Sequence, residues 1–150
     1  MSEEQFQRGI TEFNRGCYFE CHDTLEDLWH GTRGNDRLFL QGLIQISVGF
    51  YHLLNRNYKG ATSQFTRGLN KLDRYRPTHR GIELEGFMRS VVRWLSLAER
   101  GVVGTSVEID EGELPKLQFV STIGDSAKVQ QTGGAVTDPK PIDNILTRRA

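Results

Sequence analysis

The sequence predicts an all-α protein, a compact bundle of about five helices, and three observations favour this fold class. Over the first two thirds of the chain, apolar residues recur at separations of three and four, the spacing of one helix face. Glycine or proline follows most of these segments, where helices commonly end. The connections are short, so neighbouring helices should pack antiparallel. A chain of 150 residues can form one domain with a substantial core.

The first two helices are expected over residues 3–15 and 18–30. The first has an apolar face at helical spacing, formed by Phe6, Ile10 and Phe13. The second ends at residues 31–34, a turn that contains two glycines. Both are short amphipathic helices of the kind that pack one face on a core.

The third helix is expected over residues 36–55 and has an unusual lack of charge. Residues 38–55 carry no charged side chain, and that length could span a membrane. Gln41, Gln45 and His52 interrupt the run, however, and polar groups are costly in lipid. We therefore expect no transmembrane span but a central helix that its neighbours bury on nearly all sides.

The fourth helix begins near Tyr58 and stops before Pro77, and the fifth is expected over residues 82–100. Both have an apolar face at helical spacing. The spacing of Tyr58, Ala61 and Phe65 is similar to half of a tetratricopeptide repeat. Three stacked repeats, the usual minimum, are not found, so the prediction is tetratricopeptide-like helix-turn-helix packing without a repeat array.

The domain organisation follows from a change in composition after Gly101. Residues 1–101 form the helical bundle, and residues 102–120, apolar around Pro115, are expected as an extended segment that packs on it. Residues 121–150 are mostly polar and rich in glycine, and they predict a flexible tail.

The charge of the chain is balanced overall but not along its length. Nineteen basic and nineteen acidic residues argue against a wholly basic nucleic-acid-binding protein, and nucleic acid is not an expected partner. Residues 1–36 carry a net charge of −5, residues 37–101 of +7 and residues 102–150 of −2. Two cysteines and an acidic start without a signal peptide predict a cytoplasmic protein.

Polar side chains fall on helix faces that should be buried. On the second helix, one sector of roughly 100° contains two ionisable residues among apolar ones; its members are Tyr18, His22, Leu25, Glu26 and Trp29. On the third helix, Gln41, Gln45 and His52 lie within about 40° of one another. Gly42 and Gly49 form a strip beside them that a backbone or a ligand could approach.

Three functional interpretations of this polar cluster are possible. His22, Glu26 and His52 could bind a divalent transition metal. Glu26, desolvated beside His22, could instead be a catalytic acid or base. The glutamine amides could also bind a small polar molecule, with Tyr18 and Trp29 as further candidate contacts. The alternative is a closed structural network in which the buried polar groups satisfy one another.

Basic side chains form stripes on the last two helices. The stripes consist of Arg67, Lys71 and Arg74 on the fourth helix and of Arg89, Arg93 and Arg100 on the fifth. A solvated face paired with local acids explains them, and a docking surface for an acidic protein partner is the alternative.

Two runs, residues 13–29 and 39–52, carry a long motif. They resemble the domain of unknown function 309 family, whose pattern is a Gly-x-aromatic-aromatic-Glu-x-His helix with a later Glu-x-x-Trp, then Phe-x-Gln-Gly-x-x-Gln and Tyr-His. Its signature positions are occupied by Glu20, His22, Glu26, Trp29, Gln41, Gln45 and His52. Cys21 and Asp23 are mild departures. The resemblance covers residues 4–97 and implies a compact all-α bundle, but it supplies no biochemical function.

Two hypotheses follow. The first is a helical domain whose polar cluster binds a small polar ligand or a metal, with hydrolytic or proton-transfer activity as an extension. The second is a non-enzymatic adaptor that contacts another protein through its basic helix faces and its tail.

Overall fold

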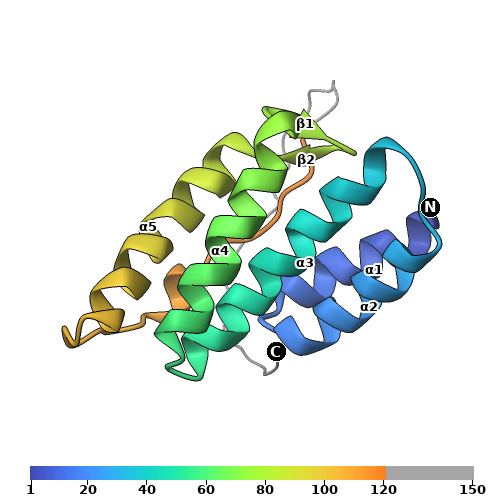
Figure 1. The fold of residues 1–150 in the computed structure, drawn as a ribbon. Coiled ribbons are helices and arrows are strands. Elements are labelled where there is room, and N and C mark those ends of the chain that lie inside the picture. The colour runs from blue at the N-terminus through green and yellow to red at the C-terminus, as the bar shows by residue number, and fades with distance from the viewer. Residues whose placement is uncertain (121–150) are drawn as a thin grey trace.

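A computed structural model describes residues 1–120 and confirms the all-α fold. The five helices are α1 (Glu3–Asn14), α2 (Tyr18–His30), α3 (Asn35–Leu54), α4 (Tyr58–Leu72) and α5 (Glu85–Val102). Figure 1 shows α3 in the middle of the bundle, with α1 and α2 on one side and α4 and α5 on the other. This position explains the uncharged run in α3, because helices cover it from both sides.

The start of α5 is the clearest departure from the expected helix boundaries. Residues before it form a hairpin of two short antiparallel strands, β1 (Thr78–His79) and β2 (Ile82–Glu83). Arg80 and Gly81 make its turn with positive φ angles of 49° and 80°. The expected helix start at Ile82 is therefore wrong, because Ile82 is buried as part of a strand and the helix begins only at Glu85.

Glycines allow α3 and α4 to approach closely. A Cβ atom on Gly49 would lie 2.5 Å from the Phe65 ring, and one on Gly42 would lie 2.9 Å from Leu72. On the facing helix, a Cβ atom on Gly68 would lie 2.9 Å from the Gly42 carbonyl oxygen. The glycine strip predicted on α3 is thus occupied by α4 rather than by a ligand.

The core is centred on Phe50 of α3, which is fully buried. Its ring centre lies 6.0 Å from that of Phe13, 5.4 Å from Tyr18, 4.7 Å from Phe65 and 6.3 Å from Trp94. These four rings come from α1, α2, α4 and α5, so one side chain contacts every other helix of the bundle.

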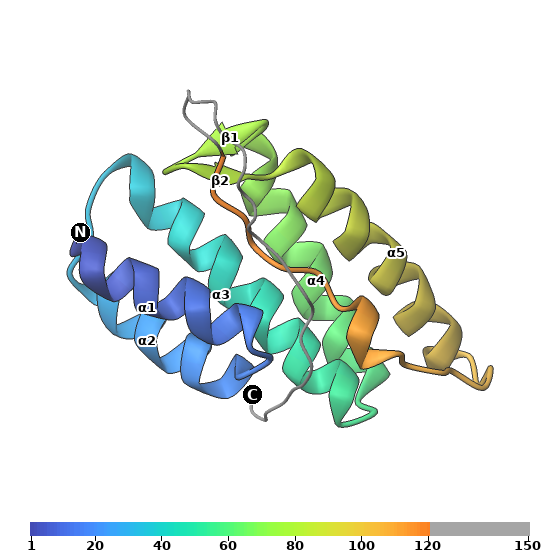
Figure 2. The same cartoon turned by 180° about the vertical axis from the view of Figure 1, so that it is seen from behind.

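The chain after α5 crosses the back of the bundle and returns toward the hairpin, as Figure 2 shows in orange. The Asn14 side chain donates to the Leu117 carbonyl oxygen at 2.8 Å and accepts from the Leu117 amide at 2.7 Å. Phe119 then forms an antiparallel bridge with Ile82. These contacts join the segment to α1 and to β2. The predicted flexible tail, residues 121–150, lies outside the described residues.

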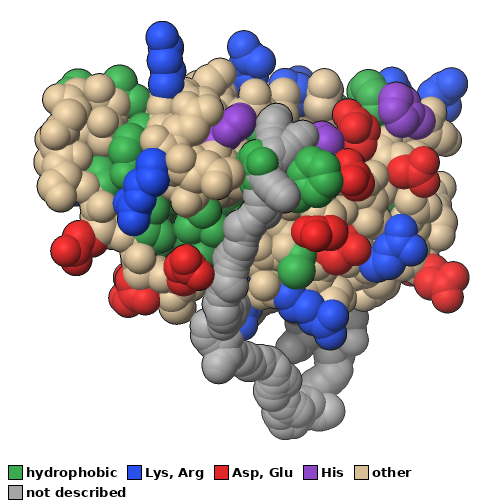
Figure 3. All heavy atoms as spheres, turned by 90° about the horizontal axis from the view of Figure 1, so that it is seen from below, with side chains coloured by type: hydrophobic (Ala, Val, Ile, Leu, Met, Phe, Trp, Pro, Cys, Tyr) green, Lys and Arg blue, Asp and Glu red, His purple; other side chains and the backbone are tan. Residues whose placement is uncertain are grey.

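The outer surface of the described residues gives two further observations. None of the helices within residues 1–120 is long and apolar enough to cross a membrane. On the face drawn in Figure 3, acidic and basic side chains are interspersed rather than gathered by sign.

Candidate functional site

A pocket of about 260 Å³ opens between α2, α3 and α4. It is lined by His22, Glu26, Trp29, Gln41, Ile44, Gln45, Val48 and Gln64. Five of these are candidates from the sequence, namely His22, Glu26, Trp29, Gln41 and Gln45. The volume lies below the usual range for drug-sized ligands, so the pocket suits a smaller molecule.

The α2 wall of the pocket is ionisable. His22 and Glu26 are four residues apart and therefore neighbours on one helix face. His22 Nε2 lies 3.6 Å from Glu26 Oε1, and His22 Nδ1 lies 3.3 Å from Asp23 Oδ1. The His22 side chain is 16% exposed and that of Glu26 46% exposed. The Glu26 side chain is thus accessible to solvent, whereas the interpretation of Glu26 as a catalytic acid or base assumes a desolvated carboxyl.

The α3 and α4 walls combine amides with apolar side chains. Gln41 and Gln45 lie one turn apart on α3, and Gln64 of α4 faces the same space. Ile44 and Val48, only 8% and 7% exposed, form the apolar part of the lining. Amides both donate and accept hydrogen bonds, so this surface can bind a polar group in either role.

Two buried polar atoms of the lining lack hydrogen-bond partners within residues 1–120. They are the indole nitrogen Nε1 of Trp29 and the amide oxygen Oε1 of Gln45. One is a donor and the other an acceptor. A buried polar atom without a partner costs about 1–3 kcal/mol. The polar cluster is thus not fully satisfied by the described residues, in contrast to a closed structural network.

Arg37 fixes the Trp29 side of the pocket. Its guanidinium carbon lies 3.9 Å from the centre of the Trp29 ring. Its Nη1 donates to the carbonyl oxygens of Trp29 and Thr32, each at 2.9 Å. These contacts join the end of α2 to the start of α3 and hold the indole in place.

Tyr18 and His52 lie outside the pocket. Tyr18 is 1% exposed and its ring stacks on Phe50 in the core. His52 lies near the end of α3, where its Nδ1 is 3.2 Å from the Asn57 side-chain nitrogen. A helix wheel gives the direction of a side chain but not its height. His52 is seven residues beyond Gln45, a rise of roughly 10 Å.

The predicted metal site of His22, Glu26 and His52 is therefore not formed. His52 does not line the pocket that contains the other two residues. Within the part of the chain that the structure describes, no group of three or more His, Cys, Asp or Glu residues could hold a metal ion. The reason is geometric. His52 points from α3 in nearly the same direction as Gln45, but it lies about two turns further along the helix and so outside the pocket that contains His22 and Glu26.

Gln64 is the pocket residue that the sequence analysis missed. It belongs to α4, whose polar residues were interpreted through their positive charge. The sequence feature that could have identified Gln64 is its uncharged amide, one turn before Arg67. Glu20, by contrast, is exposed in the first turn of α2, where a carboxylate favours the helix start.

Two ionisable groups outside the pocket, Cys21 and Glu12, are affected by burial. Cys21 is fully buried, and burial raises the pKa of its thiol, so the reactive thiolate is disfavoured. Burial likewise raises the pKa of the Glu12 carboxyl, and a hydrogen bond with Thr24 opposes that rise. Both groups lie outside the pocket.

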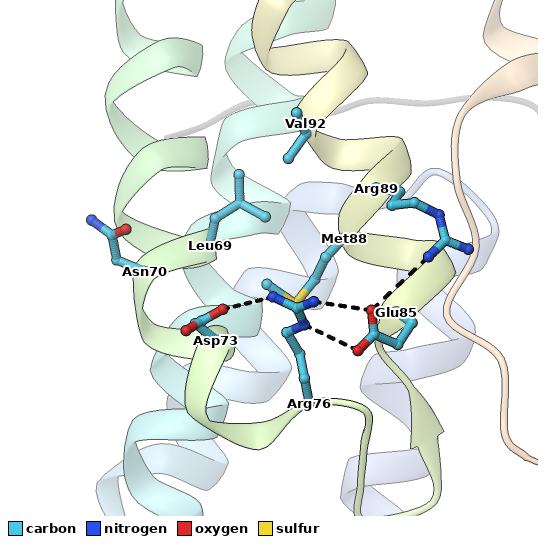
Figure 4. Close-up of a pocket in the computed structure, with 8 residues that line it drawn as sticks. All are labelled: Leu69, Asn70, Asp73, Arg76, Glu85, Met88, Arg89 and Val92. Atoms are coloured by element: carbon cyan, nitrogen blue, oxygen red, sulfur yellow. Dashed lines mark hydrogen bonds and ion pairs between the residues drawn. The ribbon is translucent and has the colours of Figure 1, made fainter.

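A second pocket of about 340 Å³ lies between α4 and α5 (Figure 4). Arg76 crosses it, with Nη1 2.8 Å from Asp73 Oδ1 and Nη2 3.1 Å from Glu85 Oε1. Arg89 also reaches Glu85 at 3.9 Å. The charged groups at this site are paired with one another, so the first pocket is the stronger candidate despite its smaller volume.

The basic stripes of α4 and α5 lie at the surface. Arg67, Arg74 and Arg93 are exposed and Lys71 is half-buried. Among residues 1–120, none of these four forms an ion pair, whereas Arg89 has its weak contact with Glu85. Local acids of the described region thus do not neutralise most of this charge.

Fold and site together define a five-helix bundle with a polar pocket between three helices. The family model described as domain of unknown function (DUF309) matches residues 6–64. This match confirms the resemblance to the DUF309 family that was inferred from the sequence. The match covers α1 to the middle of α4 and includes every residue that lines the pocket. No curated protein matches the chain.

Proposed function

We propose that the helical domain binds a small polar molecule in the pocket between α2, α3 and α4. The observation that carries the proposal is the convergence of polar side chains from three helices on one pocket of about 260 Å³. The match to the family model spans the whole lining.

The unpartnered atoms indicate what the molecule would offer. An acceptor of the ligand would satisfy Trp29 Nε1, and a donor would satisfy Gln45 Oε1. In the free protein both atoms are desolvated without gaining a hydrogen bond, and a ligand that bonds to them would offset this cost in free energy. His22 and Glu26, 3.6 Å apart, are also placed to exchange a proton with a bound molecule.

The variant Gln45→Leu tests this role in a thermal-shift screen of small polar compounds. Removal of an unpartnered buried acceptor should leave the free protein as stable as the wild type or slightly more stable. The affinity for compounds that stabilise the wild type should fall about tenfold, because the hydrogen bond to the ligand is lost.

Gln7→Leu is the matched control, since Gln7 is exposed on α1 and outside the pocket. It should leave both the melting temperature and the ligand response unchanged. If Gln45→Leu destabilises the free protein and leaves every ligand response intact, Gln45 has a structural role and the proposal fails.

A second candidate function is a protein adaptor, favoured by the exposed arginines without ion pairs within residues 1–120. An acidic partner would contact Arg67, Lys71 and Arg74 on α4, with Arg89 and Arg93 on α5 as a further patch. Charge reversal of Arg67, Lys71 and Arg74 to glutamate should abolish capture of acidic partners in pull-down experiments, with the circular dichroism spectrum unchanged. A folded triple variant that retains every partner would contradict this function.

A further inference from the structure

We infer that the ligand of the pocket is a small primary amine that binds in its protonated, positively charged form. The inference rests on the proposed function and assigns the chemical class of its ligand. It follows from the residues of the lining itself, which include the carboxylate of Glu26 but no lysine or arginine.

The Glu26 carboxylate lines the pocket without a permanent cation beside it. Among residues 1–120 it forms an ion pair with His22 alone, at 3.6 Å, and a histidine is charged only when it is protonated. The pocket between α4 and α5 is different, because Arg76 lies 2.8 Å from Asp73 and 3.1 Å from Glu85 and neutralises both. Glu26 is therefore an acid of a pocket lining that a ligand cation could still neutralise.

A second carboxylate adds to the negative charge of this wall. Asp23 Oδ1 lies 3.3 Å from His22 Nδ1, on the other side of the imidazole ring from Glu26. Even a protonated His22 balances only one of these two carboxylates. An anionic ligand would thus be repelled from the α2 wall of the pocket, and a cationic ligand would be attracted to it.

Arg37 does not reverse this balance. Its guanidinium carbon lies 3.9 Å from the centre of the Trp29 ring, and its Nη1 donates to the carbonyl oxygens of Trp29 and Thr32. It does not line the pocket, and within residues 1–120 it forms no ion pair with Glu26. Because this cation already covers the indole ring, we expect the amine of the ligand at Glu26 and not on the indole.

The other polar groups of the lining can also accept hydrogen bonds from an amine. A protonated primary amine has three donors and no acceptor. Glu26 offers carboxylate oxygens for a charge-assisted hydrogen bond, and Gln41, Gln45 and Gln64 each offer an amide oxygen. Gln45 Oε1 is the buried acceptor that lacks a partner among the described residues, so an N–H group of the amine would satisfy it.

The remaining lining suits a short carbon chain. Ile44 and Val48 supply apolar surface. At about 30 Å³ per water molecule, the volume of about 260 Å³ equals that of roughly nine waters, which is enough for a chain of a few methylene groups. A hydroxyl oxygen on the same chain could accept a hydrogen bond from Trp29 Nε1, the buried donor without a partner in residues 1–120.

Isothermal titration at pH 7 with three matched compounds tests the inference. 4-Aminobutan-1-ol, butane-1,4-diol and 4-hydroxybutyrate share a hydroxyl group at one end and are positive, neutral and negative at the other. The amine is protonated at this pH, since the side-chain amine of lysine has a pKa of about 10.4. The amine should bind about tenfold more tightly than the diol, and hydroxybutyrate should bind most weakly.

The variant Glu26→Gln isolates the ion pair, because it removes the charge and keeps the shape of the side chain. The affinity for the amine should fall about tenfold, to that of the diol, and the affinity for the diol should change little. Glu20→Gln is the matched control, since Glu20 is an exposed carboxylate on the same helix and lies outside the pocket. It should leave the preference for the amine unchanged.

The outcomes distinguish this inference from the proposed function. If the diol or hydroxybutyrate binds as tightly as the amine, or if the amine keeps its advantage in Glu26→Gln, the inference is wrong. If none of the three compounds binds, the Glu26→Gln comparison is made on the best compound of the thermal-shift screen. A best compound without an amine, or one that binds Glu26→Gln as tightly as the wild type, then overturns the inference and leaves the proposed function standing. If neither experiment finds a ligand of the pocket, the proposed function itself fails.

Discussion

Replacement of Phe50 by alanine is expected to lower the free energy of unfolding by about 3–5 kcal/mol. The loss is large because the ring is fully buried and contacts aromatic rings from all four other helices. A cavity at this point removes contacts that no single neighbouring helix can recover by moving inward. Against a typical total of about 5–15 kcal/mol, the variant should be marginally folded.

Urea unfolding followed by circular dichroism measures this effect. Phe119→Ala is the matched control, because it removes the same side chain from a position that is 40% exposed. We expect the control to lose clearly less stability than Phe50→Ala. Equal losses in the two variants would contradict the central role of Phe50 in the core.

The second large effect is expected for Gly68→Ala, with a loss of about 2–3 kcal/mol. The new Cβ atom would lie 2.9 Å from the Gly42 carbonyl oxygen and 2.7 Å from the Ile46 side chain. Because the first contact is with backbone, α3 and α4 must move apart. Alanine favours a helix over glycine by about 1 kcal/mol, and the clash must exceed this gain.

Gly86→Ala is the control for this substitution. Gly86 lies in the first turn of α5, and the nearest atoms to its Cβ would be side-chain ends, Glu83 Oε1 at 3.2 Å and Arg89 Nη2 at 3.6 Å. These side chains can move, so this variant should be neutral or slightly stabilised. If Gly68→Ala melts at or above the temperature of the wild type, the close packing of α3 on α4 is wrong.

Most of the helical fold could be predicted because helices repeat a pattern that the sequence carries over many residues. The second helix was expected over residues 18–30 and is observed at Tyr18–His30. The β1–β2 hairpin was missed because strands of two residues are too short to show a period of two. The one sequence feature that could indicate the hairpin is the turn at Arg80 and Gly81, and no alternating apolar pattern flanks this turn.

Some residues of the pocket could be predicted from the sequence and others could not, because a helix wheel gives the direction of a side chain but not its position along the helix axis. His22, Glu26 and Trp29 share a face of α2, and the wheel identified that face. Tyr18 and His52 share faces with these candidates but lie at other levels along their helices, where the core or a helix end surrounds them. The spacing of residues along a helix shows in which direction each side chain points. Which side chains of α2, α3 and α4 meet at the same height depends on how these helices are aligned, and only tertiary packing sets that alignment.

The indole resonances of the two tryptophans test the central claim, a ligand pocket between α2, α3 and α4, most directly. Trp29 lines the pocket and its Nε1 has no partner among residues 1–120, while Trp94 packs near Phe50 in the core. In ¹H–¹⁵N spectra, assigned with a Trp29→Phe variant, a binding compound should shift the Trp29 indole signal and leave that of Trp94 in place. Compounds that bind without moving the Trp29 signal would contradict the account.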